Sequence, residues 1–190
     1  SKEQSSIIYG GFLGLCYLTP MLGGFIADRF LGNRLCILLG GLLMASGQML
    51  LFVSATTFSS NLELARTLLY VALGIIILGN GFFKPNISTL LGNFYSKEEY
   101  KDKKDEGYNI FYMGINVGAF LAPLIASTLG ENPFYGWKYG YFIAGIGMVL
   151  SVLIQLTLGD RYLGDVGYEP SVKLSRLKVG ESKQPLTPVE

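Results

Sequence analysis

Five long stretches of this chain are apolar enough to cross a membrane. Four carry no charged residue and one carries a single charge; they are residues 7–27, 35–55, 68–91, 108–129 and 139–158. A helix of about 20 apolar residues spans a hydrocarbon core of ~30 Å. Charged residues make up only 15% of the 190 residues and gather between the stretches, whereas a soluble domain would place charge on the outer face of each helix. We therefore predict an all-α integral membrane protein with five transmembrane helices.

The basic residues predict the orientation of these helices, because Lys and Arg accumulate in short cytoplasmic loops. Eleven of them follow the first, third and fifth stretches, and the opposite side holds only Lys2, Arg66 and Lys138. The N-terminus is therefore expected outside, and the connection at 28–34 inside. We expect a membrane bundle at residues 1–158, followed by a polar cytoplasmic linker at 159–190.

An outside start is unusual without a cleavable signal sequence, and the opening residues SKEQSS lack an initiator Met. We expect a further helix upstream, so that the chain is a fragment of a longer protein.

Composition argues against several other classes. The chain has no His, which excludes a His-based catalytic triad and an imidazole metal site, and no metal site is expected. Cys16 and Cys36 lie within or beside apolar stretches, where a free thiol behaves as a small hydrophobic group, and we expect no disulfide. A net charge of +1 gives no case for nucleic-acid binding. We expect neither an enzyme nor a cofactor.

Lys84 is the one charged residue inside an apolar stretch. An ammonium group in hydrocarbon costs several kcal/mol, so it normally faces a watery cavity and has a function. The alternative is that the side chain snorkels to the cytoplasmic interface. Leu90 and Leu91 still lie about 9–10 Å beyond Lys84 along a helix, which favours the cavity and points to a transporter.

Polar residues recur at helical spacing in two stretches, at Asn80, Lys84 and Ser88 in one and at Asn109, Tyr112 and Asn116 in the other. Such spacing places each set on one face of its helix and predicts a shared water-filled cavity. Interhelical hydrogen bonding remains an open alternative for Asn80 and Asn109.

Glycines and prolines also follow a pattern within the apolar stretches. Small residues at helical spacing permit close packing of helices in lipid, and we expect this role for Gly10, Gly14, Gly40, Gly41, Gly47, Gly114 and Gly118. Pro20, Pro85 and Pro123 each remove one helical hydrogen bond and predict kinks that would suit a transporter.

The segment from Gly23 to Arg34, GGFIADRFLGNR, resembles the loop between the second and third helices of the major facilitator superfamily. It repeats that loop's pattern of Gly-x-x-x-Asp-Arg followed by Gly and a basic residue, here with the residues Gly24, Asp28, Arg29, Gly32 and Arg34. The resemblance implies that Asp28 takes part in a cytoplasmic charge network that steadies one conformation.

A second segment, Phe111 to Gly118, is similar to the fifth-helix signature Phe-Tyr-x-x-Ile-Asn-x-Gly of the proton-dependent oligopeptide transporter family. Residues 83–88, FKPNIS, resemble the fourth-helix lysine segment of the same family. The matches occur in order and cover residues 7 to about 163.

The resemblance implies helices two to six of twelve, a partial N-terminal six-helix bundle of the major facilitator fold. The first helix, with its Glu-x-x-Glu-Arg motif, and the C-terminal half would be missing partners, and the fragment would not transport alone. The expected function is proton-coupled import of di- and tripeptides by alternating access, with protons as the only coupling ion, in a plasma membrane such as the bacterial inner membrane.

The same resemblance implies roles for individual residues. Lys84 would pair with the first-helix glutamates and bind the peptide carboxylate, Asn116 would bind the peptide backbone, and Tyr17 would line the cavity. Tyr112 and Asn80 join this substrate-binding and proton-coupling set through their positions on the polar faces. Two alternatives stay open: another solute on this scaffold, such as nitrate or an anionic metabolite, and a non-transporting membrane assembly subunit.

Overall fold

The computed structural model describes residues 2–132, 134 and 136–173. It contains five α-helices, which are α1 (Lys2–Ile26), α2 (Asn33–Thr57), α3 (Leu62–Phe94), α4 (Lys104–Gly130) and α5 (Trp137–Leu163). All five are long and apolar enough to cross a membrane, which confirms the predicted fold class. The predicted linker falls partly outside the described residues, at positions 174–190.

The helices extend beyond the apolar stretches that predict them. α3 covers Leu62–Phe94 where the sequence predicts 68–91, and α5 continues to Leu163, past the expected boundary at 158. A helix goes on satisfying its own backbone hydrogen bonds after it leaves hydrocarbon, until a cap ends it. At the start of α3 that cap is Asn61, whose side chain accepts a hydrogen bond of 3.0 Å from the backbone N–H of Leu64.

The connection between α1 and α2, expected at 28–34, is a π-helical turn, η1 (Ala27–Leu31). It ends at Gly32, whose φ of 80° is a conformation that side-chain-bearing residues rarely adopt. A Cβ at this position would also collide with the backbone carbonyl of Tyr168. Gly32 therefore permits both the sharp entry into α2 and the close approach of the segment that follows α5.

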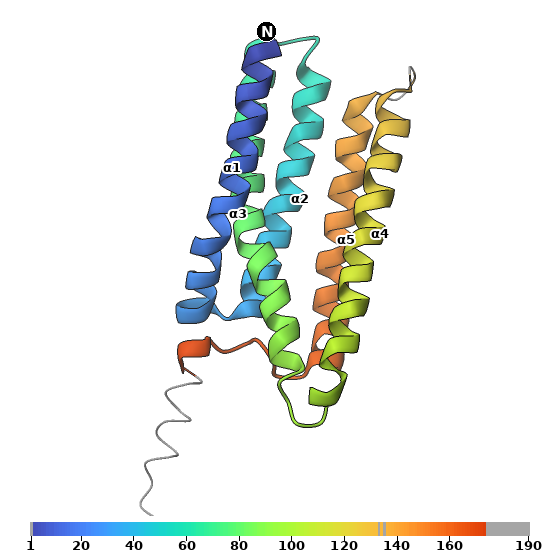
Figure 1. Cartoon of the computed structure of the whole chain (residues 1–190). Helices are drawn as coiled ribbons and strands as arrows, with labels where there is room; N and C mark the ends of the chain where they lie inside the picture. The colour runs from blue at the N-terminus through green and yellow to red at the C-terminus, as the bar shows by residue number, and fades with distance from the viewer. Residues whose placement is uncertain (1, 133, 135, 174–190) are drawn as a thin grey trace, which may run out of the picture.

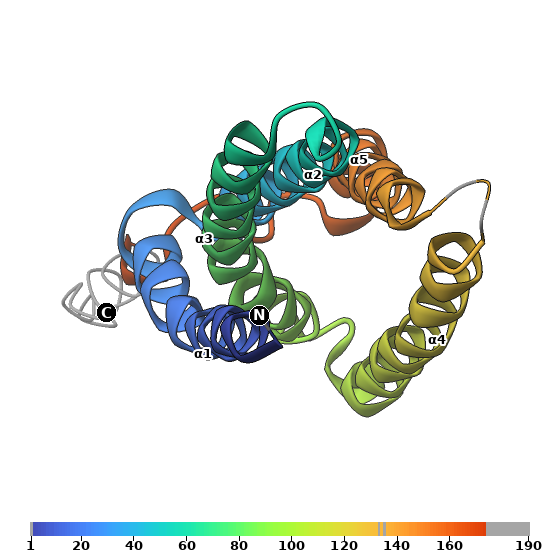
Figure 2. The same ribbon diagram turned by 90° about the horizontal axis from the view of Figure 1, so that it is seen from above.

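The five helices form an open arc when viewed along their axes, with α1 and α4 at its two ends (Figure 2). The connections α1–α2 and α3–α4 and the segment after α5 lie at one end of the bundle, opposite the N-terminus (Figure 1). These are the segments in which the basic residues gather.

The centre of the bundle is the interface of α2 with α3, where Leu51, Ala72 and Ile76 form a buried core. Glycines allow these helices to approach closely, because a Cβ built on Gly40 would lie 2.7 Å from the carbonyl oxygen of Gly79. Gly41 and Gly47 are equally crowded, against Val152 and Ile76. The predicted packing role is confirmed for these three glycines.

The packing role of four other glycines stays a prediction, because no described residue lies against them. A Cβ built on Gly10, Gly14, Gly114 or Gly118 would meet nothing within 4 Å. They lie in α1 and α4, the helices at the ends of the arc, where no neighbouring described helix covers them. The prolines do not break their helices, because α1, α3 and α4 run through Pro20, Pro85 and Pro123.

Candidate functional site

Lys84 lies on the exposed side of α3, next to α1. Its Nζ is 4.7 Å from the centre of the Tyr17 ring, within the range of a cation–π interaction. Among the described residues, no carboxylate lies within 4 Å of Nζ. Two of the predicted site residues are thus brought together, on different helices.

Asn80, one helical turn before Lys84, makes an interhelical hydrogen bond. Its Nδ2 donates to the backbone carbonyl of Cys16 over 2.8 Å. Thr19 reinforces the same interface, since its hydroxyl donates to the carbonyl of Ile77 over 3.2 Å. The structure therefore supports helix packing, the alternative that the sequence left open for Asn80.

Tyr112 and Asn116 lie on α4, and the structure does not join them to Lys84 or Tyr17 through any hydrogen bond between described residues. Both side chains are exposed, and Asn116 Nδ2 donates to the carbonyl of Tyr112 over 2.9 Å. α4 meets α3 near the start of α4, where the Tyr108 hydroxyl donates to the Ser88 carbonyl oxygen over 3.4 Å. The shared cavity between the two polar faces stays a prediction.

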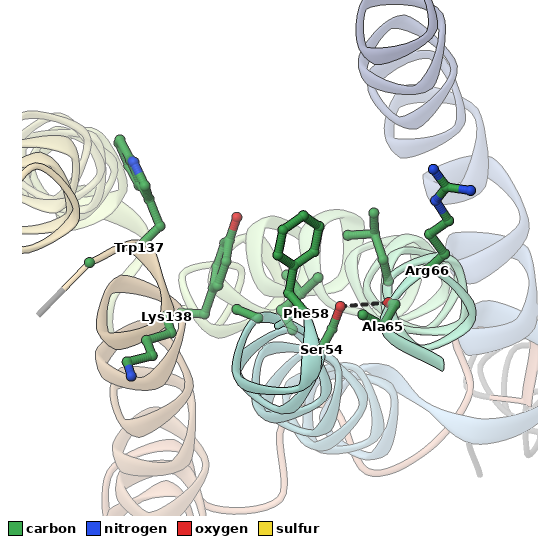
Figure 3. A pocket seen from close by; sticks show the side chains of 11 residues that line it. Ser54, Phe58, Ala65, Arg66, Trp137 and Lys138 are labelled. Carbon is green, nitrogen blue, oxygen red and sulfur yellow. Dashed lines mark hydrogen bonds between the residues drawn. The ribbon is translucent and has the colours of Figure 1, made fainter. Parts of the chain in front are cut away.

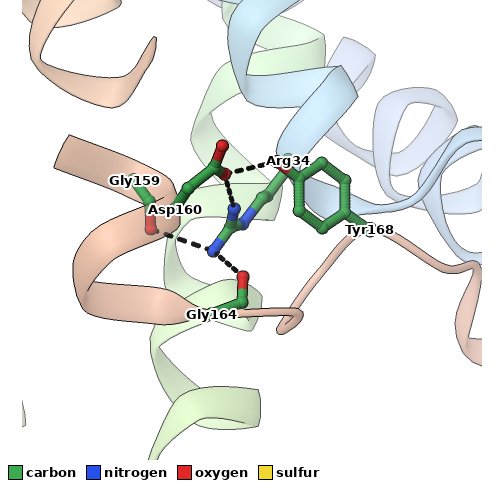
Figure 4. Close-up of polar contacts among 5 residues, drawn as sticks. All are labelled: Arg34, Gly159, Asp160, Gly164 and Tyr168. Carbon is green, nitrogen blue, oxygen red and sulfur yellow. Dashed lines mark hydrogen bonds and ion pairs between the residues drawn. The ribbon is translucent and has the colours of Figure 1, made fainter. Parts of the chain in front are cut away.

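Arg34 is the centre of a polar cluster at the end of the bundle opposite the N-terminus, with only 3% of its side chain exposed. Its guanidinium forms an ion pair of 2.7 Å with Asp160 and donates to the carbonyls of Gly159 (3.1 Å) and Gly164 (2.6 Å). The ring of Tyr168 stacks against it at 4.4 Å, and the Tyr168 hydroxyl donates to Asp160 (Figure 4). These contacts hold the start of α2 against the end of α5.

The other residues of the predicted cytoplasmic motif have simpler surroundings. Asp28 is exposed and accepts a hydrogen bond of 2.9 Å from Ser171, but forms no ion pair with a described residue. Arg29 lies over the Phe25 ring at 5.8 Å. Gly24 faces α3, because a Cβ there would lie 3.8 Å from Pro85. Within the described chain, the charge network therefore centres on Arg34 rather than on Asp28.

Sequence reasoning missed a series of hydrogen-bonded amides beside this motif, in which Asn33 and Asn86 are buried. Asn33 Nδ2 donates to Asn86 Oδ1 over 3.0 Å, and Asn93 Nδ2 donates to Asn33 Oδ1 over 3.2 Å. Asn86 also donates to the carbonyl of Phe82 over 2.7 Å and, more weakly at 3.4 Å, to that of Gly23. These hydrogen bonds join α1, α2 and α3, and Asn86 lies two residues after Lys84. The helical spacing of Asn86 and Asn93 is the one feature of the sequence that indicates this arrangement.

A cavity of about 510 Å³ lies at the opposite end of the bundle, between α2, α3 and α5 (Figure 3). Its lining includes Ser54, Phe58, Arg66, Trp137 and Lys138, and Ser54 donates to the carbonyl of Ala65 over 2.7 Å. The basic side chains of Arg66 and Lys138 point away from one another (Figure 3). None of the predicted site residues lines this cavity.

Known proteins resemble the chain over most of its length. A protein of Lactococcus lactis subsp. lactis named di-/tripeptide transporter is 39% identical over 170 residues, which are 90% of this chain and 32% of that protein. The peptide transporter YePEPT of Yersinia enterocolitica subsp. palearctica is 37% identical over 174 residues, with the same coverage. The chain thus spans about a third of the length of the curated relatives it matches.

Solved structures agree with this likeness. A peptide transporter POT in complex with sulfate superposes with a TM-score of 0.74 at 31% identity, covering 90% of this chain and 34% of that one. A POT family transporter in complex with 5-aminolevulinic acid gives a TM-score of 0.72 at 30% identity, with the same coverage. These proteins are transporters, which confirms the prediction that the chain is not an enzyme.

The sequence model of the POT family matches residues 34–177, a range that includes the lysine segment, the fifth-helix signature and the segment after α5. The first motif, at 24–34, lies almost wholly before this range, so its assignment depends on the relatives, which cover 90% of the chain. The chain belongs to the POT family.

Proposed function

We propose that the full-length protein is a proton-coupled symporter that imports di- and tripeptides by alternating access. The observation that carries this proposal is the 39% identity, over 90% of the chain, to a protein named di-/tripeptide transporter. Protons are the only coupling species that the proposal requires, and it needs no cofactor. The first helix and the C-terminal half of the transporter would complete the substrate site.

Lys84 is the residue on which coupling would depend. Its ammonium group is exposed on α3, and no described carboxylate neutralises it. A carboxylate from the first helix would pair with it until that carboxylate takes up a proton, and the ammonium could then pair with the carboxylate end of a peptide. Proton and substrate would in this way bias the same conformational equilibrium.

Asn116 would contribute the second contact with the substrate. Its Nδ2 is used by the Tyr112 carbonyl, while its Oδ1 accepts no hydrogen bond from the described residues. Oδ1 can therefore accept from a peptide N–H, and Nδ2 can exchange its partner for a peptide carbonyl. Recognition through the backbone and the terminal charges would leave side-chain selectivity broad. Tyr112 would line the same wall.

The proposed orientation places η1, the α3–α4 connection and residues 159–190 in the cytoplasm. Its support is that the α1–α2 and α3–α4 connections, which are rich in Lys and Arg, share one end of the bundle with the described residues that follow α5 (Figure 1). The curated relatives named above come from bacteria, which supports the bacterial inner membrane as the location.

Uptake by the purified full-length protein in liposomes tests the function. An inward proton gradient should drive accumulation of radiolabelled dialanine above its external concentration, and an ionophore that collapses the gradient should abolish that accumulation. Nitrate offered under the same gradient tests the alternative cargo. Gradient-driven accumulation of nitrate without dialanine would replace the peptide assignment, and accumulation of neither would favour a non-transporting subunit.

A further inference from the structure

Lys84 and Tyr17 form an unusual pair for residues on two membrane helices. The Lys84 Nζ lies 4.7 Å from the centre of the Tyr17 ring and forms no ion pair with a described carboxylate. The face of an aromatic ring attracts a cation through its quadrupole without carrying a charge of its own. The Tyr17 ring thus stabilises the positive charge of Lys84 without neutralising it.

Hydrogen bonds on both sides of Tyr17 fix its position relative to α3. The carbonyl of Cys16, the residue before it, accepts from Asn80 over 2.8 Å, and Thr19, two residues after it, donates to the carbonyl of Ile77 over 3.2 Å. Further along, Gly23 and Gly81 bring the two backbones close together, since a Cβ on Gly23 would overlap the Gly81 carbonyl. The register of α1 against α3 is therefore set by contacts independent of the ring.

We propose that the Tyr17 ring is a resting site for the Lys84 ammonium group, which it holds in the interval between ion pairs with carboxylates. This inference rests on the proposed function, in which the ammonium leaves one carboxylate and binds another. An unpaired ammonium at this depth is costly, and a neutral ring face lowers that cost without competing with either carboxylate. Tyr17 is then a positioning residue whose effect is on turnover.

Kinetics of the full-length protein in liposomes test this role. Tyr17→Leu should lower the maximal rate of proton-driven dialanine uptake roughly threefold to thirtyfold, with a much smaller change in KM, because the ring stabilises an intermediate state. Tyr17→Phe keeps the ring and should recover most of the lost rate. Tyr9→Leu, which removes another exposed tyrosine of α1, is the matched control and should resemble the wild type.

Fluorinated phenylalanines at position 17 distinguish the electrostatic effect of the ring face from the effect of the ring's size and shape. Each added fluorine withdraws electron density from the face and weakens cation binding while the ring size changes little. The maximal rate should fall stepwise from phenylalanine to its mono-, di- and trifluoro forms. A rate that does not depend on fluorination, or a Tyr17→Leu variant in which only KM rises, would overturn the resting-site role.

A spectroscopic measurement detects the contact between Lys84 and Tyr17 independently of transport activity. Reductive ¹³C-methylation of lysines retains their charge, and the signal absent from Lys84→Arg identifies Lys84. That signal should be shifted upfield by the Tyr17 ring current, and the shift should disappear in Tyr17→Leu. An unshifted Lys84 signal overturns the inference even if peptide transport is intact. Conversely, a shifted signal in a protein that fails to accumulate dialanine supports the contact and counts against the proposed function alone.

Discussion

Arg34 and Asp160 form an ion pair of 2.7 Å across 126 positions of sequence, and it joins the first turn of α2 to the last turn of α5. The two partners differ in exposure, at 3% for the Arg34 side chain and 72% for that of Asp160. The buried cation depends on a carboxylate that water can reach. We therefore expect the loss of Asp160 and the loss of Arg34 to lower the stability of the protein by different amounts.

Asp160→Ala should destabilise the protein by about 1–2 kcal/mol, because the buried guanidinium loses its counter-charge while water can partly replace it. The measurement is the apparent Tm of the detergent-solubilised protein. Asp165→Ala removes an exposed carboxylate five positions further on and is the control. Equal Tm values for the two variants would show that the ion pair contributes nothing to stability.

Asn33→Ala should cost about 1–3 kcal/mol, since it leaves the buried Oδ1 of Asn86 without its hydrogen-bond donor, whereas the exposed Asn93 amide can bind water instead. Thermal unfolding in detergent again measures the loss. Asn109→Ala changes an exposed asparagine of α4 and should leave the Tm unaltered. If the two alanine variants unfold at the same temperature, the series of hydrogen-bonded amides is not a stabilising element.

The membrane helices could be predicted from sequence because hydrocarbon sets a minimum apolar length, and each of the five apolar stretches lies within or nearly within an observed helix. The helix ends could not be predicted in this way, because capping residues such as Asn61 lie outside the apolar stretches. Gly40 and Gly10 illustrate the limit for packing. Both occur in apolar helices, but among the described residues only Gly40 has a neighbouring helix against it.

The candidate site was predictable where one residue carries the signal by itself. Lys84 stands out because no other charge lies within its stretch. Its contact with Tyr17 depends on how α1 packs against α3, which residue spacing within a single helix does not reveal. Arg34 could be assigned to the motif from sequence, but its burial could not be predicted, because that burial depends on the return of the segment after α5.

Lys84→Ala should abolish gradient-driven accumulation of dialanine while expression and membrane insertion remain near wild type. Insertion is preserved because the change removes a charge that costs free energy in the membrane. Uptake in liposomes matched for protein content measures the effect, and Lys138→Ala, at the opposite end of the bundle, is the control. Concentrative uptake at the wild-type rate would remove Lys84 from the coupling mechanism.

Cysteine accessibility should reveal the orientation in a background without Cys16 and Cys36. Lys97 and Ser60 are exposed residues at opposite ends of the bundle, which makes them a matched pair, whereas Asn33 is too deeply buried for such a test. An impermeant thiol reagent added outside intact cells should label Ser60→Cys and leave Lys97→Cys unlabelled until the cells are opened. The reverse pattern would invert the topology.

Asn116→Leu should weaken dipeptide binding by roughly fivefold to more than a hundredfold. The amide offers both a donor and an acceptor to a peptide backbone, and an apolar replacement leaves those substrate groups unpaired at about 1–3 kcal/mol. Calorimetric titration of the full-length protein with dialanine measures the change. Because Asn116 is exposed and bonds only to its own helix among the described residues, the variant should fold normally. Unchanged affinity together with a large fall in Tm would instead make Asn116 a helix-packing residue, in contact with a part of the transporter beyond these five helices.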